Sequence, residues 1–271
     1  MATTFELRIA GEEATYAAQA ARALFDEVDR LENLLSRFRA SSDISAIAGL
    51  KPGEALRAGE DTCACLALAR DMEQATEGAF SITAAARRTQ PEAPRWTLDA
   101  TRRTVRCDAG MLEFDLGAIG KGFALDRMAG ELADWECSAF LLIAGGSSIL
   151  AGDPPPGLPG WSVGLGDDGS EPRHWLKHGS LSGSGIAVKG RHILDPRTGE
   201  PAKLRARAWA AAPSAAVSDA LSTAFMVLPE AEIVRLMAGR TEWKAYLHEE
   251  GQWRQVAGVG IEPAPIPEKS W

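Results

Sequence analysis

The segment from Asp115 to Asp126, DLGAIGKGFALD, constrains the fold more than any other part of the chain. Its first residues end a short apolar run over 111–116 that is typical of a strand. Three glycines and a lysine follow. Beyond them, apolar side chains recur at helical spacing at Leu125, Met128, Leu132 and Trp135. The pattern predicts a strand, a glycine-rich turn and an amphipathic helix in direct succession.

The chemistry of this turn favours an anionic ligand. Backbone N–H groups at a glycine-rich helix start have no partner within the helix, so they attract phosphate. Lys121 adds a positive charge, and Asp115 is placed to bind a polar group or approach a metal. The turn is not a P-loop, because Gly122 follows the lysine where that motif needs Ser or Thr. The alternative is that the glycines only permit a tight connection, with Lys121 solvated.

Length and composition are those of a soluble globular protein with one large or two small domains. The chain has 271 residues, 45% of them apolar and 24% charged. Its net charge is −8, and acidic and basic residues are interspersed, so no nucleic-acid surface is expected. An acidic protein that binds a phosphorylated ligand must concentrate positive charge locally or recruit a cation, which makes a metal ion plausible.

The cysteines and the N-terminus bear on the compartment. The four cysteines show no disulfide framework, and we expect free or buried thiols. The first nine residues lack the pattern of a signal peptide, and no stretch is apolar for long enough to span a membrane. As written, the sequence predicts a cytoplasmic protein, although a chain from which a leader had been removed would look the same.

The rest of the chain alternates between predicted helices and strands. We expect helices over 14–38, 62–75, 218–227 and 230–237, with a short helix after residue 41. Predicted strands cover 5–9, 79–83, 96–98, 104–106, 139–143, 149–150, 161–165, 242–247 and 252–256. The run GLGDDG at 164–169 formally matches a dinucleotide fingerprint, but two acidic residues and a proline that follows favour a hairpin turn. The proline-rich tail, 262–271, is expected to be poorly ordered.

The sequence HILDPRTGEP at 192–201 predicts a tight turn after a short strand. Asp195 leads the turn, Pro196 fixes φ at the next position, and Gly199 can adopt positive φ. His192 lies between Arg191 and this turn. It is either a structural histidine or one placed for proton transfer.

The sequence SDALSTA at 218–224 opens a helix on which Asp219 and Thr223 share one face. A carboxylate and a hydroxyl, completed by backbone carbonyls, water and phosphate, are ligands that magnesium accepts. The alternative is purely local: Asp219 caps the helix, and Thr223 bonds back to a carbonyl.

Together, these three motifs resemble the FAD:protein FMN transferase (ApbE-type flavin transferase) family. The shorter matches LSRF at 35–38 and GAF at 78–80 agree, and the resemblance runs in order from Met1 to about Val256. It implies an α+β fold related to the T-fold: a single domain over 1–271 with mixed or antiparallel sheets packed with helices. It also implies magnesium-dependent transfer of FMN from FAD to a Thr or Ser hydroxyl of an acceptor protein, with release of AMP.

The resemblance also implies roles for individual residues. Asp115 and Lys121 would serve the flavin nucleotide, and His192 would be the general base. Magnesium would be held by the Ala118 carbonyl, Asp219 and Thr223. The remaining FAD contacts would be Met1, Phe38, Ala79, Phe80, Ser81 and Ile193. Implied partners are FAD and an acceptor protein with a Thr/Ser flavinylation motif, with no nucleic acid and no membrane span.

The chain departs from the family pattern at several positions. Ser81 stands where family members usually carry Asp, and Ala84-Ala85-Ala86 replaces a Gly-Pro-Leu-like sequence. Ser147 follows the Gly-Gly pair where an acidic residue is usual, and the region between Arg87 and Trp96 is shorter than typical. These losses keep two other functions open: a magnesium-dependent FAD pyrophosphatase, and an FAD-binding protein without catalysis.

Overall fold

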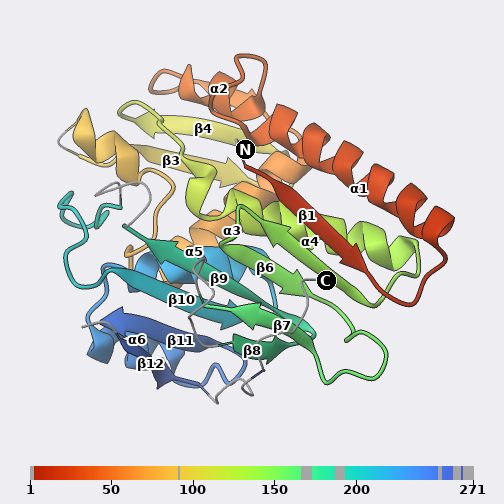
Figure 1. Ribbon diagram of the computed structural model, residues 1–271. Helices are drawn as coiled ribbons and strands as arrows, with labels where there is room; N and C mark the ends of the chain where they lie inside the picture. Colours follow the sequence, from red (N-terminus) through yellow and green to blue (C-terminus); the bar gives the residue numbers. More distant parts are fainter. Residues whose placement is uncertain are drawn as a thin grey trace.

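A seven-stranded antiparallel sheet is the centre of the fold in the computed structural model, which describes residues 3–90, 92–165, 173–186, 193–249, 252–258 and 264 (Figure 1). The sheet runs in the order β1-β5-β6-β9-β10-β11-β12. Its strands are β1 (Phe5–Ile9), β5 (Phe140–Ala144), β6 (Ser148–Ala151), β9 (Gly179–Gly185), β10 (Arg207–Ala212), β11 (Lys244–Glu249) and β12 (Gln252–Ala257). A three-stranded sheet has the order β2-β4-β3 and a separate hairpin is formed by β7 and β8. These strands are β2 (Ala55–Arg57), β3 (Arg95–Asp99), β4 (Thr104–Ala109), β7 (Trp161–Gly164) and β8 (Arg173–Leu176).

The helices complete the architecture. They are α1 (Ala14–Leu35), α2 (Asp43–Ala48), α3 (Glu60–Ala75), α4 (Gly120–Asp134), α5 (Ala215–Phe225) and α6 (Glu230–Met237), with 3-10 turns η1 (Ala84–Arg88) and η2 (Leu116–Ala118). None of the helices in the described part of the chain is long and apolar enough to cross a membrane.

Alternation along the central strands buries both faces of the large sheet. In β5, Leu142 packs toward α1 and α4, while its neighbour Leu141 packs toward the β7–β8 hairpin. Successive side chains of a strand point to opposite faces, so one strand can serve two cores. In β10, Ala208 and Trp209 divide in the same way. Because the core clusters share these elements, the described residues form one domain.

Helix α5 is almost entirely buried. It packs on β9, β10 and α4, and nine of its residues are buried, so it is apolar or small on most sides. Helices that are buried all round follow this pattern, whereas α1 buries a single stripe of residues: Ala20, Leu24, Val28, Leu31 and Leu35. Asp219 on α5 therefore lies inside the protein, whereas Thr223 on the same helix is only partly buried.

Several elements predicted from sequence differ in the structure. Residues 111–115 form no strand: Gln90 instead pairs with both backbone groups of Met111, and the Asp115 N–H donates to the Ile82 carbonyl at 2.7 Å. Residues 79–83 also form no strand but a turn that leads into η1. In both segments, hydrogen bonds to side chains and to single backbone groups take the place of pairing with a neighbouring strand.

Other differences concern boundaries and omissions. Helix α5 begins at Ala215, one turn before the predicted start, because Ser214 caps it by accepting from the Val217 N–H at 3.3 Å. Strands β2, β9 and β10 were not expected from the sequence. The hairpin predicted around 164–169 is present in the pairing of β7 with β8, although residues 166–172 lie outside the described part of the chain.

Candidate functional site

The glycine-rich turn is organised by Asp115. Its Oδ1 accepts the Gly117 N–H at 2.9 Å, which caps η2 one turn before α4 begins at Gly120. Its Oδ2 lies 3.3 Å from the Arg37 guanidinium, and both side chains are close to half exposed. Asp115 thus ties the turn to the segment that follows α1 while its carboxylate still reaches solvent.

Lys121 and Asp219 form the charged centre of the site. The Lys121 ammonium lies 3.2 Å from both Asp219 carboxylate oxygens and also donates to the Gly117 carbonyl at 3.2 Å. The Asp219 side chain is 2% exposed and that of Lys121 is 20% exposed. Two of the three sequence motifs, separated by about one third of the chain, therefore meet at one ion pair. Its lysine faces the solvent side.

The Asp219 carboxylate has two further partners that sequence reasoning missed. The Gly122 N–H donates to Oδ2 at 3.1 Å, and the Ser148 hydroxyl on β6 donates to Oδ1 at 2.8 Å. Ser148 is fully buried. A buried carboxylate requires such donors, because desolvation otherwise disfavours its charge.

Close packing of α4 on α5 brings these groups together. A methyl group at Gly122 would lie 2.1 Å from the Ala215 carbonyl oxygen, so only glycine permits this helix crossing. Asp126, one turn later on the same face of α4, accepts from the Ser214 hydroxyl at 2.6 Å and from the Ala215 and Ala216 N–H groups at 2.7 and 3.0 Å. Burial raises the pKa of Asp126, against the effect of these donors. The four-residue spacing from Gly122 is a sequence signal that could have identified Asp126.

Thr223 lies one turn after Asp219, as its spacing predicts. Its hydroxyl is 3.4 Å from the Asp219 backbone carbonyl and 3.0 Å from the Ser184 hydroxyl. This is the geometry of back-bonding within a helix. Ala118 lies in η2, next to the Gly117 carbonyl that accepts from Lys121.

The donor chemistry around Asp219 suits a small hard cation. The described residues contain no group of three or more His, Cys, Asp or Glu side chains arranged for a metal, so a metal bound through several such ligands is not built into them. Magnesium commonly takes only one or two carboxylates and completes its shell with carbonyls, water and phosphate. A buried carboxylate beside a hydroxyl and backbone carbonyls fits that requirement once the Lys121 ammonium, 3.2 Å from both carboxylate oxygens, gives up one of them.

The third motif forms the expected tight turn. The Asp195 carbonyl accepts from the N–H groups of Thr198 at 3.2 Å and Gly199 at 2.8 Å, and Gly199 has a φ of +78°. Burial opposes ionisation of the Asp195 carboxyl, but hydrogen bonds from Arg197 outweigh it and lower its pKa. Ile193 is 7% exposed, and its carbonyl accepts from the Ala202 N–H at 2.9 Å.

Two side chains anchor this turn from outside. Arg87 of η1 donates to the Pro196 carbonyl at 3.2 Å, and Glu232 of α6 lies 3.2 Å from the Arg197 guanidinium. The chain is therefore held in place directly after residue 192. His192 itself and Met1 lie outside the described residues, as does most of the strand predicted before Asp195. Within the described part of that predicted strand, Leu194 makes an isolated bridge to Pro201.

The two aromatic candidates lie in opposite environments. Phe38 is 79% exposed, and the Arg37 guanidinium lies 4.8 Å from its ring centre. Phe80 and Ala79 are each 1% exposed, so the Phe80 ring is a core residue and cannot cover a flat ligand. The Ser81 hydroxyl is 2.9 Å from that of Thr83. Burial raises the pKa of the nearby Glu73 carboxyl, and a hydrogen bond with Ser81 partly offsets this.

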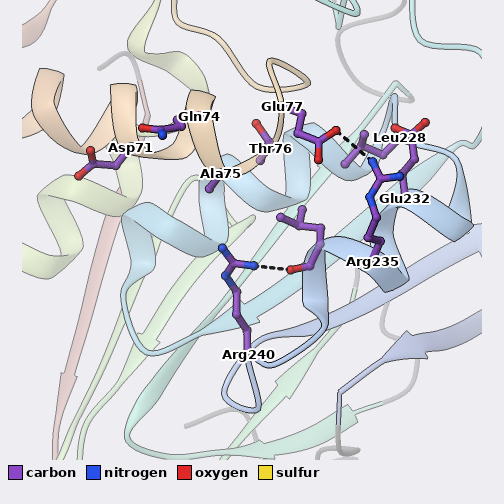
Figure 2. Close-up of a pocket in the computed structure, with 10 residues that line it drawn as sticks. Asp71, Gln74, Ala75, Thr76, Glu77, Leu228, Glu232, Arg235 and Arg240 are labelled. Carbon is purple, nitrogen blue, oxygen red and sulfur yellow. Dashed lines mark hydrogen bonds and ion pairs between the residues drawn. The ribbon is translucent and has the colours of Figure 1, made fainter.

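A cavity of about 500 Å³ lies between the end of α3 and α6. Figure 2 shows residues that line it. Glu77 pairs with Arg235 at 3.0 Å on one side, and Arg240 donates to the Leu236 carbonyl at 2.6 Å on the other (Figure 2). A second cavity of about 510 Å³ includes Gly78 and Leu98. Neither cavity is lined by Lys121 or Asp219, so the ion pair belongs to a separate surface.

Comparisons with known proteins agree with the motifs. Curated relatives named FAD:protein FMN transferase include one from Rhodobacter capsulatus, 31% identical over 54% of this chain and 30% of its own length. Others come from Klebsiella pneumoniae, 26% identical over 56% of this chain and 47% of its own length, and Escherichia coli strain K12, 30% identical over 46% and 40%. The matches therefore span less than half the length of these relatives.

Solved structures give the same fold. The flavin transferase ApbE of Vibrio cholerae superposes with a TM-score of 0.76 at 19% identity, covering 95% of this chain and 94% of that one. The apo flavinyl transferase ApbE of Pseudomonas stutzeri gives 0.79 at 19% identity, covering 94% and 92%. The ApbE protein of Thermotoga maritima gives 0.77 at 22% identity, covering 93% and 96%. These identities are low enough that the structures speak for the fold alone. The model of the ApbE family matches residues 1–247, and the chain therefore belongs to that family.

Proposed function

We propose that this protein transfers FMN from FAD to a Thr or Ser hydroxyl of an acceptor protein, with magnesium present and AMP released. The observation that carries the proposal is the Lys121–Asp219 pair, in which two motifs of an ApbE-family chain meet. The Asp219 carboxylate is buried, and the Lys121 ammonium lies 3.2 Å from it. Displacement at phosphorus builds negative charge on phosphate oxygens and on the leaving group. A site for this reaction needs concentrated positive charge, and an acidic protein must supply it locally.

Lys121 and the start of α4 supply part of that charge. The ammonium group is 20% exposed and can donate to a phosphate oxygen while it keeps a contact to Asp219. The first turn of α4, which begins at Gly120, adds the positive end of the helix dipole. Asp219, Thr223 and the Ala118 carbonyl would hold magnesium. When bound, that ion would neutralise phosphate charge.

His192 is proposed as the general base for the acceptor hydroxyl. A histidine has a moderate pKa and can take a proton at neutral pH. The turn that follows supports the proposal, because the hydrogen bonds of Asp195 and Ile193 fix the backbone immediately after His192.

The flavin end of the substrate is assigned to the surface around Phe38. Its exposed ring can stack on a flat ring system, and Asp115 lies nearby through their common neighbour Arg37. Met1, Ile193 and the backbone of Ala79, Phe80 and Ser81 complete the proposed FAD contacts. A contact by Ala79 or Phe80 has to run through the backbone, since their side chains are buried.

Incubation with FAD and MgCl2 tests the reaction. We expect AMP to appear, and an acceptor peptide with a central threonine to gain the mass of FMN. AMP with free FMN and no modified peptide would instead indicate a pyrophosphatase. Bound FAD with no AMP, at any magnesium concentration, would indicate a binding protein and refute the proposal.

Two variants assign the roles within the proposed site. His192→Ala should keep FAD binding and lose most transfer, by a factor of about 10² to 10⁴. His178→Ala is the matched control, because this histidine is exposed and its imidazole lies 3.4 Å from the Asp153 carboxylate. An unchanged rate in His192→Ala would remove this residue from the mechanism. Asp219→Ala should abolish the magnesium dependence of turnover, and superimposable titration curves would show that the assigned metal ligands are wrong.

A further inference from the structure

Ser148 is an unusual residue for its place in the fold. It lies on β6, is fully buried, and points to the side of the sheet where α4 and α5 pack. Its neighbour on that face, Leu150, belongs to the apolar core, while Ile149 and Ala151 pack toward the β7–β8 hairpin. A hydroxyl in such a position costs free energy unless it forms a hydrogen bond. The bond it forms is the one to Asp219 Oδ1 at 2.8 Å.

The two carboxylate oxygens of Asp219 are held from two directions. Ser148, on the central sheet, donates to Oδ1, and the Gly122 N–H, at the start of α4, donates to Oδ2 at 3.1 Å. Both donors are neutral, buried and carried by rigid elements. Lys121 approaches both oxygens at 3.2 Å and is the charged partner of the group. The neutral donors thus set the orientation of the carboxylate, and a divalent cation would take the place of one of the two Lys121 contacts.

We infer that Ser148 is a positioning residue that orients the Asp219 carboxylate for a divalent cation. The inference rests on the proposed function and adds to it a residue outside the three motifs. Groups that hydrogen-bond to a ligating carboxylate fix its orientation, and their loss typically lowers metal affinity 10- to 100-fold. Ser148→Ala removes only the hydroxyl that donates to Oδ1 and leaves Asp219, Thr223 and Lys121 in place.

A second buried serine of the central sheet, Ser182, provides a matched control. Ser182 is also fully buried, lies opposite Ser148 on β9, and bonds to the Ser218 hydroxyl of α5 at 2.7 Å. Ser182→Ala therefore removes a buried hydroxyl from the same sheet-to-helix interface without touching the carboxylate. Ser148→Thr keeps a hydroxyl at the position and serves as the rescue variant.

The test measures Mn²⁺ binding to the full chain by electron paramagnetic resonance, without FAD. It also measures the Mg²⁺ concentration that gives half-maximal AMP release, and thermal unfolding of each variant. We expect Ser148→Ala to weaken Mn²⁺ binding about 10- to 100-fold and to raise the half-maximal Mg²⁺ concentration, with kcat at saturating Mg²⁺ changed much less. Ser182→Ala should keep wild-type affinity, and Ser148→Thr should recover most of it.

The outcomes separate the inference from the proposed function. Equal Mn²⁺ affinity in wild type and Ser148→Ala, with AMP release intact, would overturn the inference and leave the proposed function standing. Equal losses in Ser148→Ala and Ser182→Ala would also overturn it, because the effect would then be general loosening of α5. A wild-type protein that neither binds Mn²⁺ nor releases AMP would overturn both.

Discussion

The capping of α5 by Asp126 gives a prediction whose size follows from the structure. The carboxylate on α4 accepts three hydrogen bonds from the first turn of α5, two of them from backbone N–H groups. A net value of about 1 kcal/mol per hydrogen bond gives roughly 3 kcal/mol, and removing a partly buried charge returns a fraction of that. We expect Asp126→Ala to lower the free energy of unfolding by about 2–3 kcal/mol at neutral pH.

The asparagine variant refines the same prediction. Asp126→Asn keeps one acceptor oxygen but places an amide NH2 near the α5 donors, so it should lose about 1–2 kcal/mol. Asp134→Ala is the matched control on the same helix, because Asp134 is exposed, and it should change stability by less than about 0.5 kcal/mol. Urea unfolding monitored by circular dichroism measures all three variants.

The pH dependence gives the prediction a second readout. The folded-state pKa of Asp126 is raised by burial, so the unfolded chain releases this proton at a lower pH than the folded one. The contribution of Asp126 is then greatest below its unfolded pKa, near about 3.9, and decreases as the pH rises through the folded pKa. The stability advantage of wild type over Asp126→Asn should therefore shrink on going up from about pH 4.

Two results would refute this reasoning. An Asp126→Ala variant with the urea midpoint and slope of the wild type would show that the three hydrogen bonds contribute nothing net. A wild-type advantage over Asp126→Asn that grows between about pH 4 and pH 7 would show that the pKa is lowered instead of raised.

Other predictions concern stability and flavin binding. Gly122→Ala should prevent normal packing of α4 on α5 and lower the free energy of unfolding by about 3 kcal/mol. Gly130→Ala on the same helix, with nothing within 4 Å of the new methyl group, should raise it by about 0.5–1 kcal/mol, and coinciding thermal melts of the two variants would contradict this. Arg205 is 7% exposed and donates to the Phe225 carbonyl, to the Leu228 carbonyl at 2.8 Å and to Glu249 at 3.1 Å. Arg205→Ala should therefore lower the free energy of unfolding in urea by about 3 kcal/mol, and a loss below about 0.5 kcal/mol would show that water replaces the guanidinium. Phe38→Ala should leave the free energy of unfolding unchanged within about 0.5 kcal/mol, because the ring is 79% exposed. It should weaken FAD binding measured by flavin fluorescence, and unchanged binding would remove Phe38 from the proposed flavin contacts.

Local sequence was sufficient wherever a short-range pattern decided the structure. The apolar stripe of α1, the turn led by Asp195 with Gly199 at positive φ, and the helix after the glycine-rich turn are confirmed. Each depends on residues within about one or two turns of one another, so periodicity and turn chemistry carry the prediction. The family assignment also followed from sequence, because it depended on motifs and their order.

Pairing partners far along the chain decided what local patterns could not. Strand β9, GSLSGSG, and strand β10, RAWAAA, have compositions that favour loop and helix, yet they pair with each other at the centre of the sheet. Gly183 is required there because a methyl group would lie 2.4 Å from the Trp209 ring. Such a contact has no signature within either segment.

The candidate site divides in the same way. The sequence by itself singled out Lys121, Asp219 and Thr223 as candidate site residues, since their residue types and spacing are local properties. That the ammonium meets the carboxylate, that Ser148 and Gly122 hold its two oxygens, and that Phe80 is buried while Phe38 is exposed were decided only by tertiary structure. The physical reason is that burial and hydrogen-bond partners depend on which elements pack together, and here α4 and β6 pack against α5, which lies much later in the chain.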